Sequence, residues 1–142
     1  MTKNPHKVFF NASVILSGLY SPSGGSGKLL ADIKNRKIKG VVSELVLEEI
    51  KKNSHKIKKT LSEIQKFEKY SEIIILKAPP EKDVKKFLEK VKDPGDAHLF
   101  ASALNYKCRY LVSLDKKHVL ALKGKIKSLQ IRSPKELIEE LG

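Results

Sequence analysis

Short apolar segments alternate with longer segments of mixed polarity along most of the chain. Five of the apolar segments are too short for helices and are almost free of polar residues, which is typical of strands buried on both faces. These predicted strands are residues 8–10, 40–42, 73–76, 110–113 and 129–131. We therefore expect an α/β fold, with a central parallel sheet of about five strands and helices on both of its faces.

The segments between the strands carry apolar residues at helical spacing, bounded by capping and turn residues. The predicted helices are residues 12–19, 28–37, 44–52, 56–70, 81–92, 94–106 and 134–141. Residues 21–27 are rich in Ser and Gly and predict a flexible loop. No internal repeat or low-complexity linker divides the chain, so we expect one domain over residues 1–142.

Polar side chains follow two of the predicted strands. Asn11 comes directly after the first strand, and Asp115 follows the fourth, with Ser113 two residues before it. Ligands of such sheets bind beyond the carboxyl ends of the strands, and the ends of parallel strands meet at one edge. We therefore expect these three side chains to contribute to one site.

Two further acids are placed by helical geometry. Glu49 and Asp96 each fall near the middle of an apolar helix face, whereas Glu44 and Glu48 fall on the opposite side of their helix. Burying an unpaired carboxylate costs several kcal/mol or forces its protonation. A divalent cation shared by the buried acids would supply the missing positive charge.

The acids also have structural explanations, which the sequence leaves open. Asp115 is a suitable N-cap for a helix over residues 116–122. Asp93 is a suitable N-cap as well, with Pro94 next and Asp96 in the first turn. Glu49 could form a buried salt bridge to a lysine.

Four segments that contain these residues resemble the motifs of the PIN domain family, in order and across nearly the whole chain. They are VFFNASVILSG (8–18), VSELVLEEI (42–50), DPGDAHLFASA (93–103) and LVSLDKKH (111–118). The acids of the last three motifs correspond to Glu49, Asp96 and Asp115. The first motif has an Asp in the family, and this chain has Asn11 there.

The resemblance implies a metal-dependent ribonuclease that hydrolyses RNA phosphodiester bonds with Mg²⁺ or Mn²⁺. The implied catalytic and metal-binding residues are Asn11, Glu49, Asp96 and Asp115, with Asp93 and Ser113 in support. Many compact members are toxins of the VapC kind, which form homodimers and are silenced by an antitoxin protein. A cytoplasmic toxin of a toxin–antitoxin pair is therefore the expected role.

Asn11 is the main departure from the family pattern. Its amide has nearly the shape of a carboxylate but carries no charge, and it could instead cap the helix that begins at Ala12. The alternative function is therefore a catalytically inactive PIN-fold module that binds RNA or protein. A phosphoacceptor receiver domain fits less well, because it needs an acidic pair after the first strand.

Composition agrees with a polyanionic partner without requiring one. The formal net charge is +13, from 29 basic and 16 acidic residues, which favours binding to RNA. A lysine-rich surface is also common in proteins from thermophiles.

Cys108 is the only cysteine, so it has no disulfide partner in the chain. We expect its side chain to be buried and the protein to reside in a reducing compartment. No segment is long and apolar enough to span a membrane.

Other motifs are absent. The segment from Ser23 to Lys28 fails as a phosphate-binding loop, because Pro22 replaces its first Gly and Leu29 its Ser or Thr. The four histidines show no zinc spacing and have no cysteine partners. A dinucleotide cofactor is not expected, since no glycine-rich fingerprint follows a strand.

Overall fold

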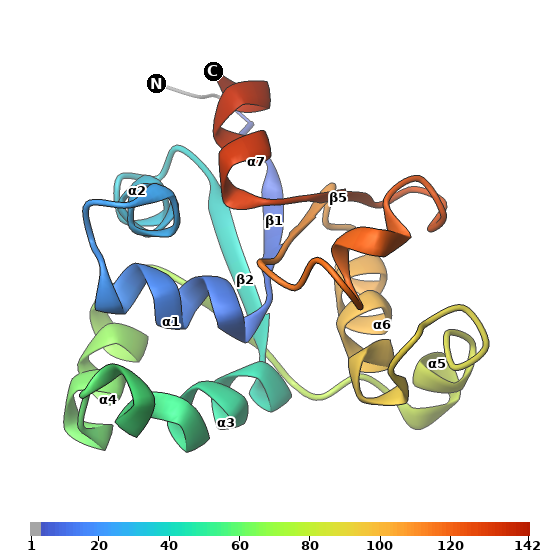
Figure 1. Ribbon diagram of the computed structural model, residues 1–142, viewed down its shortest axis with the longest axis horizontal. Helices are drawn as coiled ribbons and strands as arrows, with labels where there is room; N and C mark the ends of the chain where they lie inside the picture. The colour runs from blue at the N-terminus through green and yellow to red at the C-terminus, as the bar shows by residue number, and fades with distance from the viewer. Residues whose placement is uncertain (1–3) are drawn as a thin grey trace.

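A parallel five-stranded sheet forms the centre of the computed structural model, which describes residues 4–142 (Figure 1). The strand order is β3-β2-β1-β4-β5. The strands are β1 (Lys7–Phe10), β2 (Lys39–Ser43), β3 (Ile74–Leu76), β4 (Tyr110–Val112) and β5 (Gln130–Arg132). The predicted α/β class and parallel sheet are confirmed, while residues 1–3 of the expected single domain lie outside the described residues.

Helices cover both faces of this sheet. They are α1 (Ala12–Tyr20), α2 (Gly25–Lys34), α3 (Glu44–Asn53), α4 (Leu61–Tyr70), α5 (Glu81–Lys85), α6 (Ala97–Asn105) and α7 (Pro134–Leu141). In Figure 1, α1 to α4 lie on one side of β1 and β2, and α5 and α6 lie on the other. Successive residues of a strand point to opposite faces, and Val8, Phe9 and Phe10 are all 0% exposed, so neither face of β1 reaches solvent.

The register brings the carboxyl ends of the central strands together. Phe10 of β1 pairs with Val112 of β4, and Phe9 pairs with Val41 of β2. The residues that follow these strands therefore leave the sheet at the same edge. This edge is where the sequence places Asn11 and Asp115.

The segment expected as a flexible loop is partly helical, because α2 begins at Gly25 and ends at Lys34 instead of spanning residues 28–37. The glycines allow close packing rather than mobility. A Cβ atom on Gly27 would lie 2.2 Å from the carbonyl oxygen of Pro22.

Three predicted helices are shorter than expected. The helix over residues 56–70 is divided, since a 3₁₀ turn (Ser54–Ile57) ends at Lys58 in the left-handed region, with φ 57°. Thr60 and Glu63 then form a capping box that starts α4. The segment 81–92 is helical only in α5, and a 3₁₀ turn (Pro94–Asp96) precedes α6.

Two smaller expectations can also be compared with the structure. Cys108 is a buried free cysteine, as predicted. Within residues 4–142, none of the helices has the length and apolar character needed to cross a membrane.

Gly27→Ala should destabilise the protein, because the added methyl group would meet the backbone of Pro22 and not a movable side chain. We expect a loss of about 1–3 kcal/mol in the free energy of unfolding, measured by urea denaturation. Gly25→Ala is the matched control, since its Cβ would lie 3.7 Å from its nearest neighbours. Equal stabilities of the two variants would contradict the packing argument.

Candidate metal centre at the carboxyl ends of the strands

Asn11 points across the sheet edge toward β4. Its side chain is 8% exposed, and Nδ2 donates a hydrogen bond to Oγ of Ser113 at 2.8 Å. Its backbone nitrogen donates to the carbonyl oxygen of Val112 at 3.0 Å. The side chain forms no capping hydrogen bond to α1, so the helix-cap explanation for Asn11 is wrong.

Ser113 joins the first and last predicted site residues. It is 0% exposed, and its Oγ also accepts a hydrogen bond from the backbone nitrogen of Asp115 at 3.0 Å. A buried hydroxyl oxygen with two donors is well satisfied as an acceptor. The supporting position predicted for Ser113 is therefore a hydrogen-bonded link between Asn11 and the loop that carries Asp115.

The two carboxylate oxygens of Asp115 have different partners. Oδ1 accepts hydrogen bonds from the backbone nitrogens of Lys117 and His118, at 3.1 and 2.9 Å. Oδ2 lies 3.3 Å from Nδ1 of His118. The capping explanation therefore accounts for one oxygen, although the capped segment is a turn with a short 3₁₀ helix (Leu120–Leu122) instead of a helix over residues 116–122.

Asp93 and Asp96 differ although they share one turn. Oδ1 of Asp93 accepts a hydrogen bond from the backbone nitrogen of Gly95 at 2.9 Å, as its capping role predicts. Oδ2 of Asp96 is buried and has no hydrogen-bond partner within residues 4–142. Helix capping therefore explains Asp93 and does not explain Asp96.

Several negatively charged side chains act on the carboxyl group of Asp96. Burial, followed by the negative charges of Asp93, Asp115 and Glu49, raises the pKa of this carboxyl to about 6, while His118 opposes them. Side chains from three separate parts of the chain therefore act on one carboxyl group. An unpaired carboxylate in such surroundings requires a proton or a cation.

Glu49 reaches this group from the solvent side. Its side chain is exposed, so the prediction that it lies in the middle of a buried face is wrong. Val46 and Ile50 fill the buried face of α3, while Leu45 and Asn53 are only partly covered. In the described part of the chain no lysine forms a salt bridge with Glu49, which removes that alternative.

His118 completes a possible ligand set that the sequence analysis missed. Ligand atoms of Asp93, Asp96 and His118 all lie within 4.8 Å of one another. The histidine is brought there by the Asp115 turn, so the three-residue spacing from Asp115 to His118 was the available signal. Carboxylate oxygens and an imidazole nitrogen suit Mn²⁺, and the carboxylates also suit Mg²⁺.

In the metal-free protein, Asp96→Asn should increase stability at pH 7. The pKa of Asp96 is raised on folding, so the ionised carboxyl costs stability above its unfolded pKa, and that cost disappears as the pH falls below about 4. We expect a gain of roughly 1–2 kcal/mol at pH 7, measured by urea unfolding in EDTA.

The control for this experiment is Asp32→Asn. Asp32 forms a surface ion pair with Lys28 at 3.4 Å, so its loss should cost less than about 1 kcal/mol. A pH-independent effect of Asp96→Asn, or destabilisation at pH 7, would contradict the charge argument.

Comparisons with known proteins agree with this architecture. The family model described as the PIN domain matches residues 7–117, a span that contains Asn11, Glu49, Asp96 and Asp115 and ends one residue before His118. A search of the curated proteins finds no match.

Solved structures resemble the fold at low sequence identity. One is VapBC2 from Rickettsia felis, bound to a DNA fragment from their promoter, with a TM-score of 0.64, 15% identity and coverage of 89% of this chain and 98% of that chain. Another is PAE2754 from Pyrobaculum aerophilum, with a TM-score of 0.64, 19% identity and coverage of 96% and 95%. Motifs, fold and family match agree, and the chain belongs to the PIN domain family.

Proposed function

We propose that the protein is a metal-dependent endoribonuclease whose site contains Asn11, Glu49, Asp96 and Asp115. The observation that carries the proposal is the buried, unpartnered Oδ2 of Asp96, which lies in a field of like charges. This arrangement disfavours the free carboxylate and favours a bound cation. PIN domains bind divalent metal ions, and these donors fit Mg²⁺ or Mn²⁺.

The proposed role of each residue follows from its position in the site. Asp96 would hold the ion, with Asp93 and His118 within reach of the same point. Asp115 would offer Oδ2, which contacts only the His118 ring, because its Oδ1 is already engaged by the backbone. Glu49, being exposed, would face the arriving phosphate and its attacking water. A bound Mg²⁺ or Mn²⁺ supplies positive charge to the phosphate and lowers the pKa of water.

Asn11 keeps the geometry of the site and weakens its charge. Its amide is held by Ser113, so it occupies the position of the family's first acid without adding a negative charge. A neutral oxygen attracts a divalent cation less than a carboxylate does. The same observation favours the second candidate function, an inactive module that binds RNA or protein through the fold alone.

RNA is the substrate that the surface favours. The chain carries a net charge of +13, and Lys116 and Lys117 are exposed next to Asp115. Lysines at such positions bind phosphates by displacing counterions. The fold likeness to VapBC2 supports an antitoxin partner. The proposed role as a cytoplasmic, homodimeric toxin follows from the family resemblance alone.

Asn11→Asp should increase RNA cleavage in Mn²⁺ by about tenfold or more, which corresponds to about 1.4 kcal/mol of transition-state stabilisation. The restored carboxylate would strengthen ion binding while Ser113 keeps its orientation. Initial rates on a fluorescent oligoribonucleotide measure the change. Asn35→Asp adds the same charge at an exposed position and should leave the rate unchanged.

Adding Asp96→Asn to the Asn11→Asp variant should abolish the gained activity and so exclude a contaminating nuclease. Equal rates for the original chain and Asn11→Asp would refute the assignment of Asn11 to the site.

Divalent ions should stabilise the folded protein, because a ligand specific for the folded state shifts the unfolding equilibrium. At about one hundred times its dissociation constant, Mn²⁺ should add about 2.7 kcal/mol. Asp96→Asn should remove this increment, whereas Asp32→Asn should keep it. An unchanged melting temperature, together with RNA binding that is insensitive to EDTA, would support the inactive module instead.

A further inference from the structure

A second cleft lies at the opposite end of the sheet from Asn11. Its volume is about 820 Å³, within the roughly 300–1,000 Å³ typical of small-molecule pockets. It is lined by residues of α2 and α7 and by residues at the points where β1 and β4 begin. We call it the α2–α7 cleft, and the residues used below are His6, Lys28, Asp32, Lys37, Arg109 and Glu140.

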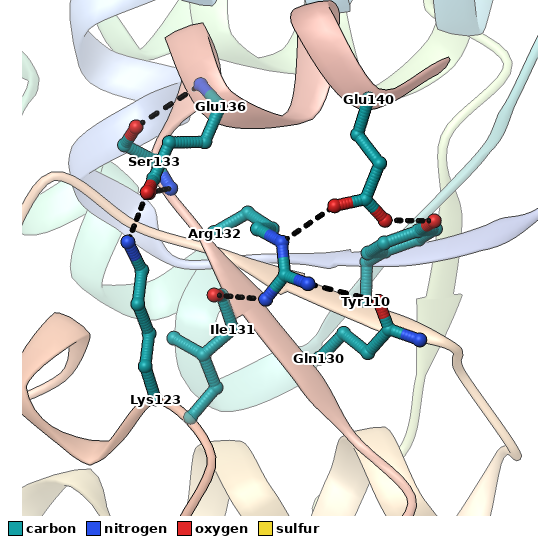
Figure 2. Close-up of polar contacts among 8 residues, drawn as sticks. All are labelled: Tyr110, Lys123, Gln130, Ile131, Arg132, Ser133, Glu136 and Glu140. Atoms are coloured by element: carbon teal, nitrogen blue, oxygen red, sulfur yellow. Dashed lines mark hydrogen bonds and ion pairs between the residues drawn. The ribbon is translucent and has the colours of Figure 1, made fainter.

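One acid of the cleft is fully engaged within the protein (Figure 2). Oε1 of Glu140 accepts a hydrogen bond from Nε of Arg132 at 2.7 Å, and Oε2 accepts one from the hydroxyl of Tyr110 at 2.6 Å. These bonds hold α7 against β4 and β5, so this wall of the cleft is already formed. Because both oxygens of the Glu140 carboxylate already accept hydrogen bonds, neither is left without a partner in the cleft.

The other acid is compensated as well. Asp32 forms an ion pair with Lys28, with 3.4 Å between Oδ1 and Nζ. No carboxylate of residues 4–142, including that of Gly142, forms an ion pair with Lys37 or Arg109. Within this part of the chain, Lys37 and Arg109 therefore have no ion pair, while Asp32 and Glu140 are already partnered. The terminal carboxylate of Gly142 also lines the cleft.

Arg109 and His6 both lie against the ring of Tyr110, which also lines the cleft. The guanidinium carbon of Arg109 lies 5.4 Å from the ring centre of Tyr110. The ring of His6 lies edge-on to the same tyrosine, with 5.7 Å between ring centres. A guanidinium that rests on an aromatic ring keeps its N–H groups free for a planar or tetrahedral anion.

The remaining walls are apolar. Leu29 and Ile38 are buried, and Ile138 and Leu141 are partly exposed where they line the cleft. A ligand that contacts both the cations and the apolar walls of the cleft would have a compact anionic group and a ring or other apolar body. An anionic group with several oxygens matches the donors of Arg109 and Lys37 better than a single charge does.

We propose that the α2–α7 cleft binds a phosphate-bearing ligand of mononucleotide size, with its phosphate between Lys37 and Arg109 and its base against the apolar walls. This cleft is separate from the candidate metal centre around Asp96 and Asp115, and the proposed binding uses no divalent ion. Its ligand is either a free nucleotide or the phosphorylated end of an RNA strand, which share this chemistry.

The test is calorimetric titration of the full chain with AMP in the presence of EDTA. Arg109→Glu and Lys37→Glu should each weaken AMP binding at least about tenfold, or about 1.4 kcal/mol. Both residues are exposed, so circular dichroism should show unchanged folding. Lys127→Glu, an exposed charge reversal outside the cleft, should bind AMP as the original chain does.

Two further arms separate the possible sources of the ligand and the possible sites. A 5′-phosphorylated oligoribonucleotide that displaces AMP assigns the cleft to RNA ends, and failure to displace it assigns the cleft to free nucleotides. Asp96→Asn should leave AMP binding unchanged whether or not the proposed nuclease activity exists. Absence of AMP binding, equal weakening by Lys127→Glu, or inorganic phosphate binding as tightly as AMP would overturn the proposal.

Discussion

The site depends on the parallel pairing of β1 with β4. The pair Phe10 and Val112, and the hydrogen bond from the Asn11 backbone to the Val112 carbonyl, bring two distant chain segments to one edge. From there Asn11, Ser113 and Asp115 follow by direct hydrogen bonds. A shift of one residue in this register would turn these side chains to the opposite face, where the helices exclude them. The position of the acids is thus a consequence of strand pairing.

Bringing the acids together at one edge of the sheet lowers the stability of the metal-free folded protein. Asp96 is partly buried among like charges, and its raised pKa shows that the folded protein disfavours the ionised form. Asn11 lowers this cost, because a fifth acid beside Ser113 would add to the repulsion. If the proposed cation binds, the amide at position 11 would lower its affinity while making the metal-free protein more stable, as expected where function and stability oppose each other.

Much of the fold and part of the site could be predicted from the chain alone. Apolar runs such as Val8–Phe10 have few alternatives to a buried strand. Helical periodicity predicted a buried face for Asp96, which lies in the 3₁₀ turn before α6 and is partly buried. Periodicity could not show that Glu49 is exposed beside the fully buried Ile50, because exposure there depends on what packs against the helix. His118 was missed for a related reason, since the Asp115 turn that carries it is neither helix nor strand. The early start of α2 depends on Gly27 approaching Pro22, a tertiary contact.

The two ends of the sheet differ in charge, although the chain as a whole is strongly basic. Asp96 and Asp115 at the carboxyl end are partly buried, so salt screens their mutual repulsion weakly. The lysines are mostly exposed and separated, and their attraction for RNA falls steeply with ionic strength. A basic surface can therefore attract a polyanion to the protein, while the small acidic cluster where the strands end keeps its negative charge for the proposed cation. Because the two effects act over different distances, they do not cancel.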